Sequence, residues 1–274
     1  KDLDNPYYQK IVSSVESNLS KNDCNMMLYS SDNRRDREEQ KIRYFIDMGV
    51  SGLILGSMSH IPFTSSLIKE LHEKQFPFVM VSYTDDPSVC FIGTNQENGG
   101  FIATEHLIKT GYSDIGYVNG EEGNLVGEAR KMGYVRALTD HKLPVNENYL
   151  YRIKVNGKRD DFKSGHDVGV EFCDRSDRPR AMFVYNDLSA LGFINALAKF
   201  GLKVPEDVAI IGFDDISIGR SSANRLTSVR QPTDMIGKLA VKNLLKMIHG
   251  KLPDPPVYRS LDPELVVRES CGAK

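Results

Sequence analysis

Short apolar runs alternate with longer segments of helical period along this chain of 274 residues. The apolar runs are continuous, without regularly interleaved polar positions, which is typical of strands buried on both faces of a parallel sheet. The runs that we interpret as strands span residues 52–56, 78–81, 115–118, 181–184 and 208–211. Alternation of strands and helices at this spacing predicts an α/β fold with doubly wound parallel sheets.

The segments between these runs carry apolar side chains on one face. A stripe that includes Ile42 predicts one helix, whose N-terminal cap we expect at Asp32 or Asn33. Three further segments have the same pattern: residues 97–110, 187–200 and 236–247. We interpret the apolar stripes as core, because amphipathic helices of globular proteins bury such faces.

Composition indicates an ordinary globular protein, with 40% hydrophobic and 26% charged residues. The length suits two lobes better than one compact core. No apolar run approaches the roughly 20 residues needed to cross a bilayer, and no signal peptide is visible, so we expect a cytoplasmic protein without a membrane partner. The net charge is −2 and the basic residues are scattered, so this chain by itself should not bind DNA.

Motifs of catalysis and metal binding are missing from the sequence. Four widely spaced cysteines, Cys24, Cys90, Cys173 and Cys271, form no CxxC pair and are expected to be buried, reduced thiols. The sequence contains no dinucleotide fingerprint after a strand, phosphate loop, nucleophile elbow or HExxH pair. We therefore expect no enzyme, no metal and no cofactor.

Polar residues follow two of these runs and a further run at residues 226–230, and ligands of doubly wound sheets bind beyond such strand ends. They are Asn186 with Asp187, Asp214 with Asp215, and Gln231. One interpretation is structural, with Asp187 as a helix cap and the two later aspartates as a turn. The other is recognition of hydroxyl groups, which carboxylates and amides can bind. Both interpretations stay open at this point.

The order of several motifs resembles the core of the lactose-repressor and galactose-repressor (LacI/GalR) family of bacterial transcription regulators. The matching blocks are residues 5–8, 50–55, 106–112, 130–134, 185–192, 201–208, 211–215, 226–232 and 264–270. These blocks span nearly the whole chain. No single block is specific, but their joint order and spacing make a chance match very improbable.

The resemblance implies two α/β lobes joined by three crossing segments, as in type I periplasmic binding proteins. We expect an N-terminal lobe at residues 1–95 plus 232–256 and a C-terminal lobe at residues 96–231 plus 257–274. The proline-rich stretch 252–256 is expected to connect the lobes. The family's helix-turn-helix headpiece has no counterpart in this sequence, and the family's first strand has almost none. By the resemblance, we therefore expect that Lys1 is not the natural start.

The resemblance also implies a function, namely the effector-sensing and dimerisation core of a transcriptional repressor. A small sugar-like effector would bind in the cleft between the lobes and change operator affinity, and the headpiece of a homodimer would contact the DNA. By similarity, the effector contacts fall on Tyr7, Tyr8, Arg130, Asn186, Asp214 and Gln231. For Phe162, stacking on the ligand and ordinary packing remain alternatives.

The alternative function is that of a secreted sugar-binding protein of a transport system, which would have the same fold. The missing signal peptide, the unpaired cysteines and the blocks at residues 204–207 and 231–232 favour the repressor.

Overall fold

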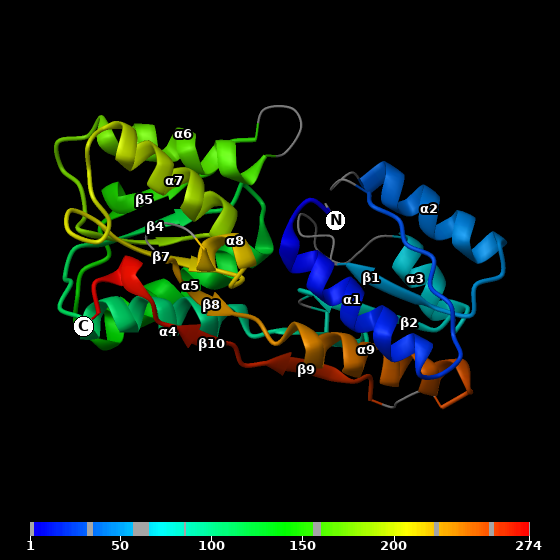
Figure 1. Ribbon diagram of the computed structural model, residues 1–274. Coiled ribbons are helices and arrows are strands. Elements are labelled where there is room, and N and C mark those ends of the chain that lie inside the picture. The colour runs from blue at the N-terminus through cyan, green and yellow to red at the C-terminus, as the bar shows by residue number, and fades with distance from the viewer. Residues whose placement is uncertain are drawn as a thin grey trace. The chain divides into compact units, whose positions relative to one another are not determined.

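A computed structural model describes residues 3–31, 35–56, 66–84, 86–155, 160–221, 225–251 and 255–273. The chain forms two compact units (Figure 1). Unit 1 comprises Lys1–Thr94 and Pro232–Leu261, and unit 2 comprises Asn95–Gln231 and Asp262–Lys274. The chain therefore passes from one unit to the other three times.

Unit 1 contains a four-stranded sheet in the order β1-β2-β3-β9, in which all neighbours are parallel. Its strands are β1 (Leu53–Gly56), β2 (Phe78–Ser82), β3 (Phe91–Thr94) and β9 (Tyr258–Leu261). Its helices are α1 (Pro6–Ser20), α2 (Arg35–Asp47), α3 (Ser66–Glu73) and α9 (Thr233–Ile248). Helix α1 begins where Asn5 accepts a hydrogen bond from the Tyr7 amide, with Pro6 at the first helical position.

Both faces of the unit 1 sheet are covered by helices. Alternate residues of β2 point to opposite faces, so the strand contributes side chains to two cores. Val79 and Val81 join a core with α1 and α9. Phe78 and Met80 join a second core with α2 and α3. This arrangement accounts for the continuous apolar run of the strand.

Unit 2 contains a six-stranded sheet in the order β10-β8-β7-β6-β4-β5, parallel except for the pair β10–β8. Its strands are β4 (Ile115–Asn119), β5 (Leu150–Arg152), β6 (Ala181–Val184), β7 (Ala209–Phe213), β8 (Thr227–Arg230) and β10 (Glu264–Val266). Its α-helices are α4 (Gln96–Lys109), α5 (Leu125–Asp140), α6 (Asp161–Cys173), α7 (Asp187–Lys199) and α8 (Ser217–Arg220). Two 3₁₀ turns span Glu147–Tyr149 and Glu269–Cys271.

Two helix pairs of unit 2 pack closely, α4 on α5 and α6 on α7. Their contacts need glycine. A Cβ added at Gly133 of α5 would lie 1.9 Å from the Glu97 carbonyl oxygen, and one at Gly192 of α7 would lie 1.9 Å from the Phe162 carbonyl oxygen. Glycine therefore permits an approach of the helix backbones that any larger side chain would prevent.

The predicted α/β class with parallel sheets is confirmed, as are the five predicted strands and the four predicted helices. Strand β9 corrects one boundary. Residues 257–261 were expected in the C-terminal lobe but belong to unit 1, because β9 pairs with β3. The expected caps Asp32 and Asn33 lie outside the described residues.

The proline-rich stretch was expected to connect the lobes, but it falls within the second segment of unit 1. Its residues 252–254 lie outside the described ranges. All four cysteines are free thiols, of which Cys90 and Cys271 are buried as expected, whereas Cys24 and Cys173 are half-buried. Across the described ranges, no helix has both the length and the apolar character needed to span a bilayer.

Candidate functional site

The carboxyl edge of the unit 2 sheet gathers the polar residues that follow its strands. Strands β6, β7 and β8 are parallel neighbours, so their carboxyl ends meet at one edge. Asp214 and Gln231 directly follow β7 and β8, Asn186 lies two residues after β6, and all three are buried. Side chains at this edge are placed where doubly wound sheets bind ligands.

Arg130 reaches this edge from α5 and is held by three contacts. Its Nε donates to Gln96 Oε1 at 2.9 Å, and its Nη1 donates to the backbone carbonyl of Tyr185. Its guanidinium carbon lies 3.5 Å from the centroid of the Phe213 ring. Helix α5 begins at Leu125, so Arg130 lies in its second turn.

Asp214 and Gln231 complete a buried network with Gln96 and Arg130, which we call the Arg130 network. Gln231 Nε2 donates to Asp214 Oδ1 at 2.6 Å, and Gln96 Nε2 lies 3.4 Å from Gln231 Oε1. Arg130 Nη2 lies 3.9 Å from Asp214 Oδ1, which is too far for a direct hydrogen bond. The structure thus brings together three of the residues predicted from the sequence.

Asn186 serves the start of α7. Its side-chain oxygen accepts from the Ser189 amide at 2.8 Å, and its Nδ2 donates to Asp161 Oδ2 at 2.8 Å. Asn186 is therefore the helix cap, and the structural interpretation that gave this role to Asp187 is wrong. Asn186 adjoins the Arg130 network through Tyr185, its neighbour in the chain, whose carbonyl accepts from Arg130.

The backbone that carries Asp214 has an unusual conformation. Asp214 has φ 112° and Asp215 has φ 47°, both in the region that side chains other than glycine disfavour. The Asp214 amide donates to the Val229 carbonyl at 2.8 Å, and the Asp215 amide donates to Ser228 Oγ at 3.0 Å. Such a conformation costs about 1–3 kcal/mol and persists only where surrounding contacts hold it.

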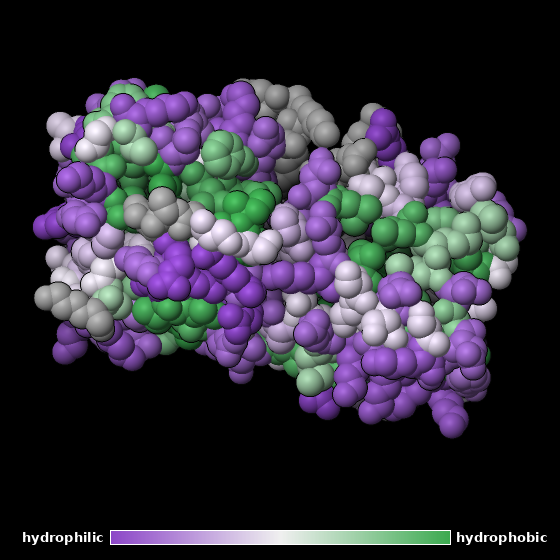
Figure 2. All heavy atoms as spheres, viewed as in Figure 1, coloured by the Kyte–Doolittle hydropathy of each residue, from purple (hydrophilic) through white to green (hydrophobic). Residues whose placement is uncertain are grey.

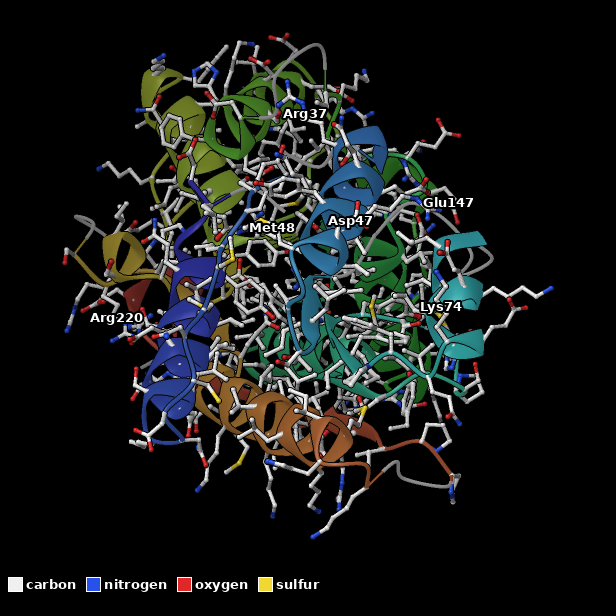
Figure 3. All side chains as sticks on the ribbon, turned by 90° about the vertical axis from the view of Figure 1, so that its right-hand side faces the viewer. Arg37, Asp47, Met48, Lys74, Glu147 and Arg220 are labelled. Atoms are coloured by element: carbon white, nitrogen blue, oxygen red, sulfur yellow. The ribbon has the colours of Figure 1, made fainter. Side chains whose placement is uncertain are left out.

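The Asp215 side chain anchors this turn through three arginines. Its Oδ2 accepts from Arg220 Nη2 at 2.7 Å and from Arg230 Nε at 2.6 Å. Its Oδ1 accepts from Arg268 of the C-terminal tail, while Arg220 comes from α8 (Figure 3). Burial of Asp215 raises its pKa, but the hydrogen bonds from Arg230 and Arg268 outweigh this effect and lower the pKa overall.

The Asp187 side chain also holds this turn. Its Oδ2 accepts from the Ile216 amide at 2.8 Å, and its Oδ1 accepts from Ser228 Oγ at 2.6 Å. Burial raises the pKa of Asp187 well above its usual range, and the negative charge of Asp214 raises it further. Asp187 and Asp215 therefore fix the position of Asp214 and do not need to contact a ligand themselves.

The remaining predicted residues lie elsewhere. Tyr7 and Tyr8 are in α1 of unit 1, where Tyr7 is buried in the core and Tyr8 packs against it. Their rings are 4.9 Å apart and nearly perpendicular. Phe162 is 43% exposed in α6, so core packing does not account for it.

Sequence reasoning missed Gln96 and Asp161. Gln96 lies two residues after β3, so the rule that singled out the other strand ends could have found it. Asp161 had no such signal, because it lies in the first turn of α6 with no predicted strand before it. The described parts of the chain contain no group of three or more His, Cys, Asp or Glu side chains arranged to hold a metal ion.

Comparisons with known proteins agree on one class of protein. A model of the periplasmic binding protein-like domain matches residues 104–271. The HTH-type transcriptional repressor PurR of Aliivibrio salmonicida (strain LFI1238) is 30% identical over 270 residues, covering 97% of this chain and 78% of that protein. The probable HTH-type transcriptional repressor ExuR of Bacillus subtilis (strain 168) is 34% identical over 225 residues, covering 81% of this chain and 65% of that protein.

A solved structure extends the likeness to three dimensions. The transcriptional regulator CelR in complex with cellobiose has a TM-score of 0.84 and 28% identity, covering 97% of this chain and 79% of that chain. The relatives are repressors, which favours a regulator over a secreted transport protein. The chain belongs to the LacI family of transcriptional regulators, in which it is an effector-sensing core with a periplasmic-binding-protein-like fold.

Proposed function

We propose that the carboxyl edge of the unit 2 sheet binds a small, neutral, hydroxyl-rich effector, namely a sugar. The observation that carries the proposal is the 3.9 Å separation between Arg130 Nη2 and Asp214 Oδ1. One hydroxyl group could accept from this guanidinium and donate to this carboxylate, because separations of this size are often bridged by a third polar group. Gln231 offers both a donor and an acceptor beside them.

The charge of the site favours a sugar over a phosphate. Arg130 faces Asp214, and Asp187 lies close enough for the negative charge of Asp214 to raise the pKa of Asp187. An anionic ligand would be repelled by the carboxylate, whereas hydroxyl groups form strong charge-assisted hydrogen bonds with it. The cellobiose complex of the related CelR structure is consistent with this ligand class.

The proposed contact set of unit 2 comprises Arg130, Asn186, Asp214 and Gln231, while ligand contact by Tyr7 and Tyr8 of unit 1 stays a prediction from the family resemblance. Effector binding at these residues would change operator affinity, since a ligand that prefers one of two states shifts the equilibrium toward it. The protein would act without catalysis, as a cytoplasmic homodimer that contacts operator DNA through a separate headpiece. The repressor relatives support this assignment.

Asp214→Asn tests the site. The substitution keeps an oxygen for Gln231 but removes the charge that strengthens hydrogen bonds to hydroxyl groups. After thermal-shift screening of a sugar library identifies a ligand, calorimetry should show affinity at least tenfold lower, because each lost charge-assisted bond contributes about 1.5–3 kcal/mol. Asp167→Asn, a change at an exposed ion pair of the same unit, is the matched control. Equal affinities of the two variants would exclude Asp214 from the site.

Sedimentation velocity tests the assembly. We expect a dimer at micromolar concentration and no salt-sensitive binding of duplex DNA by this chain, because its net charge of −2 provides little attraction for phosphates. A monomer would contradict the proposed homodimer, and duplex binding that weakens with salt would contradict the role given to the headpiece.

A further inference from the structure

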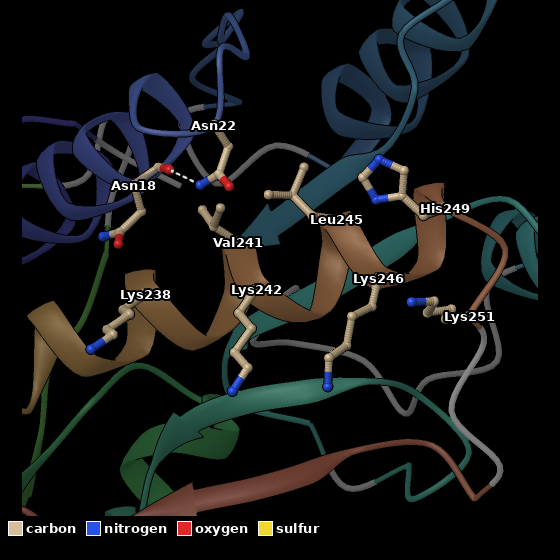
Figure 4. A pocket seen from close by; sticks show the side chains of 9 residues that line it. All are labelled: Asn18, Asn22, Lys238, Val241, Lys242, Leu245, Lys246, His249 and Lys251. Atoms are coloured by element: carbon tan, nitrogen blue, oxygen red, sulfur yellow. Dashed lines mark hydrogen bonds between the residues drawn. The ribbon is translucent and has the colours of Figure 1, made fainter.

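A groove of about 400 Å³ lies in unit 1 between α1 and α9 (Figure 4). Asn18 and Asn22 line it from α1 and the turn that follows, where Asn22 Nδ2 donates to the Asn18 carbonyl at 2.8 Å. Val241 and Leu245 point toward α1 from α9 and form an apolar lining. The groove contains none of the residues of the Arg130 network, which belongs to unit 2.

A row of lysines borders this groove. Lys238, Lys242 and Lys246 are four residues apart on α9 and are all exposed. A spacing of four residues corresponds to about 6 Å along a helix, so the row extends about 12 Å. His249 and Lys251 continue the lining beyond the row. Figure 2 shows mainly hydrophilic surface over the part of unit 1 that α9 occupies in Figure 1.

The charges of the lysine row distinguish α9 from other helices of this protein. Among the residues that the structure describes, no carboxylate forms an ion pair with Lys238, Lys242 or Lys246. Other helices of this protein place opposite charges four residues apart, as in the pairs Glu70–Lys74 and Lys163–Asp167. Like charges at this spacing destabilise a helix by a few tenths of a kcal/mol per pair, whereas opposite charges stabilise it by a similar amount.

We propose that this groove is a docking site for an acidic amphipathic helix of a partner protein. Carboxylates spaced by one helical turn would pair with the lysine row, and an apolar side chain beside them would pack on the partly exposed Leu245. Nucleic acid fits the groove less well, because phosphates would pair with the lysines but leave the apolar lining uncovered. Charge complementarity of this kind accelerates association and selects partners.

The probe for this proposal is a synthetic helical peptide of about 18 residues with glutamates at every fourth position beside a leucine stripe. A scrambled peptide of the same composition keeps the charge but not the amphipathic face. Fluorescence anisotropy should show saturable binding of the first peptide and much weaker binding of the second. The charge reversals Lys242→Glu with Lys246→Glu should lower affinity at least about tenfold.

The matched control reverses two exposed lysines outside the groove, Lys69→Glu with Lys203→Glu, which changes the net charge by the same amount. This control should retain most of the affinity. The proposal is overturned if the amphipathic peptide does not bind, if the scrambled peptide binds equally well, or if both double variants lose affinity equally. Binding of a duplex DNA as tight as that of the peptide would instead identify a general polyanion surface. None of these outcomes depends on the effector site.

Discussion

Replacing Asp215 by alanine should destabilise unit 2 strongly. The Asp215 side chain is fully buried and accepts hydrogen bonds from Arg220, Arg230 and Arg268. Alanine would leave three guanidinium groups close together without the carboxylate that compensates their charge. The same change would release the turn that holds Asp214 at φ 112°.

The size of the effect follows from the exposure of the three arginines. Arg220 and Arg230 are 47% and 41% exposed, so water compensates much of their loss, whereas Arg268 is only 12% exposed. Removing one partner of a buried ion pair costs about 3–5 kcal/mol, and exposed pairs contribute about 0–1 kcal/mol. Because one of the three arginines, Arg268, is mostly buried, we expect the free energy of unfolding to fall by about 3 kcal/mol. This loss corresponds to a melting temperature lower by roughly 6–12 °C for a unit of this size.

Urea unfolding followed by circular dichroism measures this difference. The control is Asp167→Ala, which also removes an aspartate paired at 2.7 Å, but at an exposed site where we expect little loss of stability. If Asp215→Ala loses no more stability than the control, then the three arginines do not anchor the turn and the reasoning is refuted.

The pH dependence provides a second measurement of the same interaction. The pKa of Asp215 is lowered in the folded protein, so its stabilising contribution is present above the unfolded pKa of about 3.9 and is lost as pH falls through the lowered value. The difference between wild type and Asp215→Ala should therefore be constant at neutral pH and shrink below about pH 4. A difference that grew on acidification would contradict the assigned direction.

Three further predictions concern stability. The pKa of Asp187 is raised in the folded protein, so the wild type should lose stability as pH rises from the unfolded pKa of about 4 through the raised pKa of the folded state. Asp187→Asn should therefore flatten the pH profile of urea unfolding, and an unchanged profile would contradict this. Gly192→Ala should destabilise unit 2 by about 1–3 kcal/mol, because its Cβ would lie 1.9 Å from the Phe162 carbonyl oxygen, and an unaltered urea midpoint would argue against this close packing. Asn5→Ala should destabilise unit 1 by about 1 kcal/mol through loss of the hydrogen bond to the Tyr7 amide, measurable as a lower melting temperature.

The strands and the edge of the candidate site were predictable because local patterns encode them. The run at residues 181–184 is apolar throughout since both faces of β6 are covered, and this requirement is visible in the sequence. Asn186 and Asp214 could be singled out because a polar residue directly after a buried parallel strand must lie at the carboxyl edge. Strand β9 could not be found this way, because its residues Tyr258–Leu261 are largely exposed and lack an apolar run.

The sequence by itself determined the α/β class, the order of strands and helices, and the family, because each rests on periodicity or on motif order along the chain. Only the tertiary structure decided which polar side chains meet. Gln96, Arg130, Asp214 and Gln231 come from four separate elements or loops, and their hydrogen bonds depend on how α4 and α5 pack beside the sheet. The anchoring of Asp215 by Arg268 joins residues 53 positions apart. Such contacts depend on three-dimensional geometry, and local sequence patterns do not encode it.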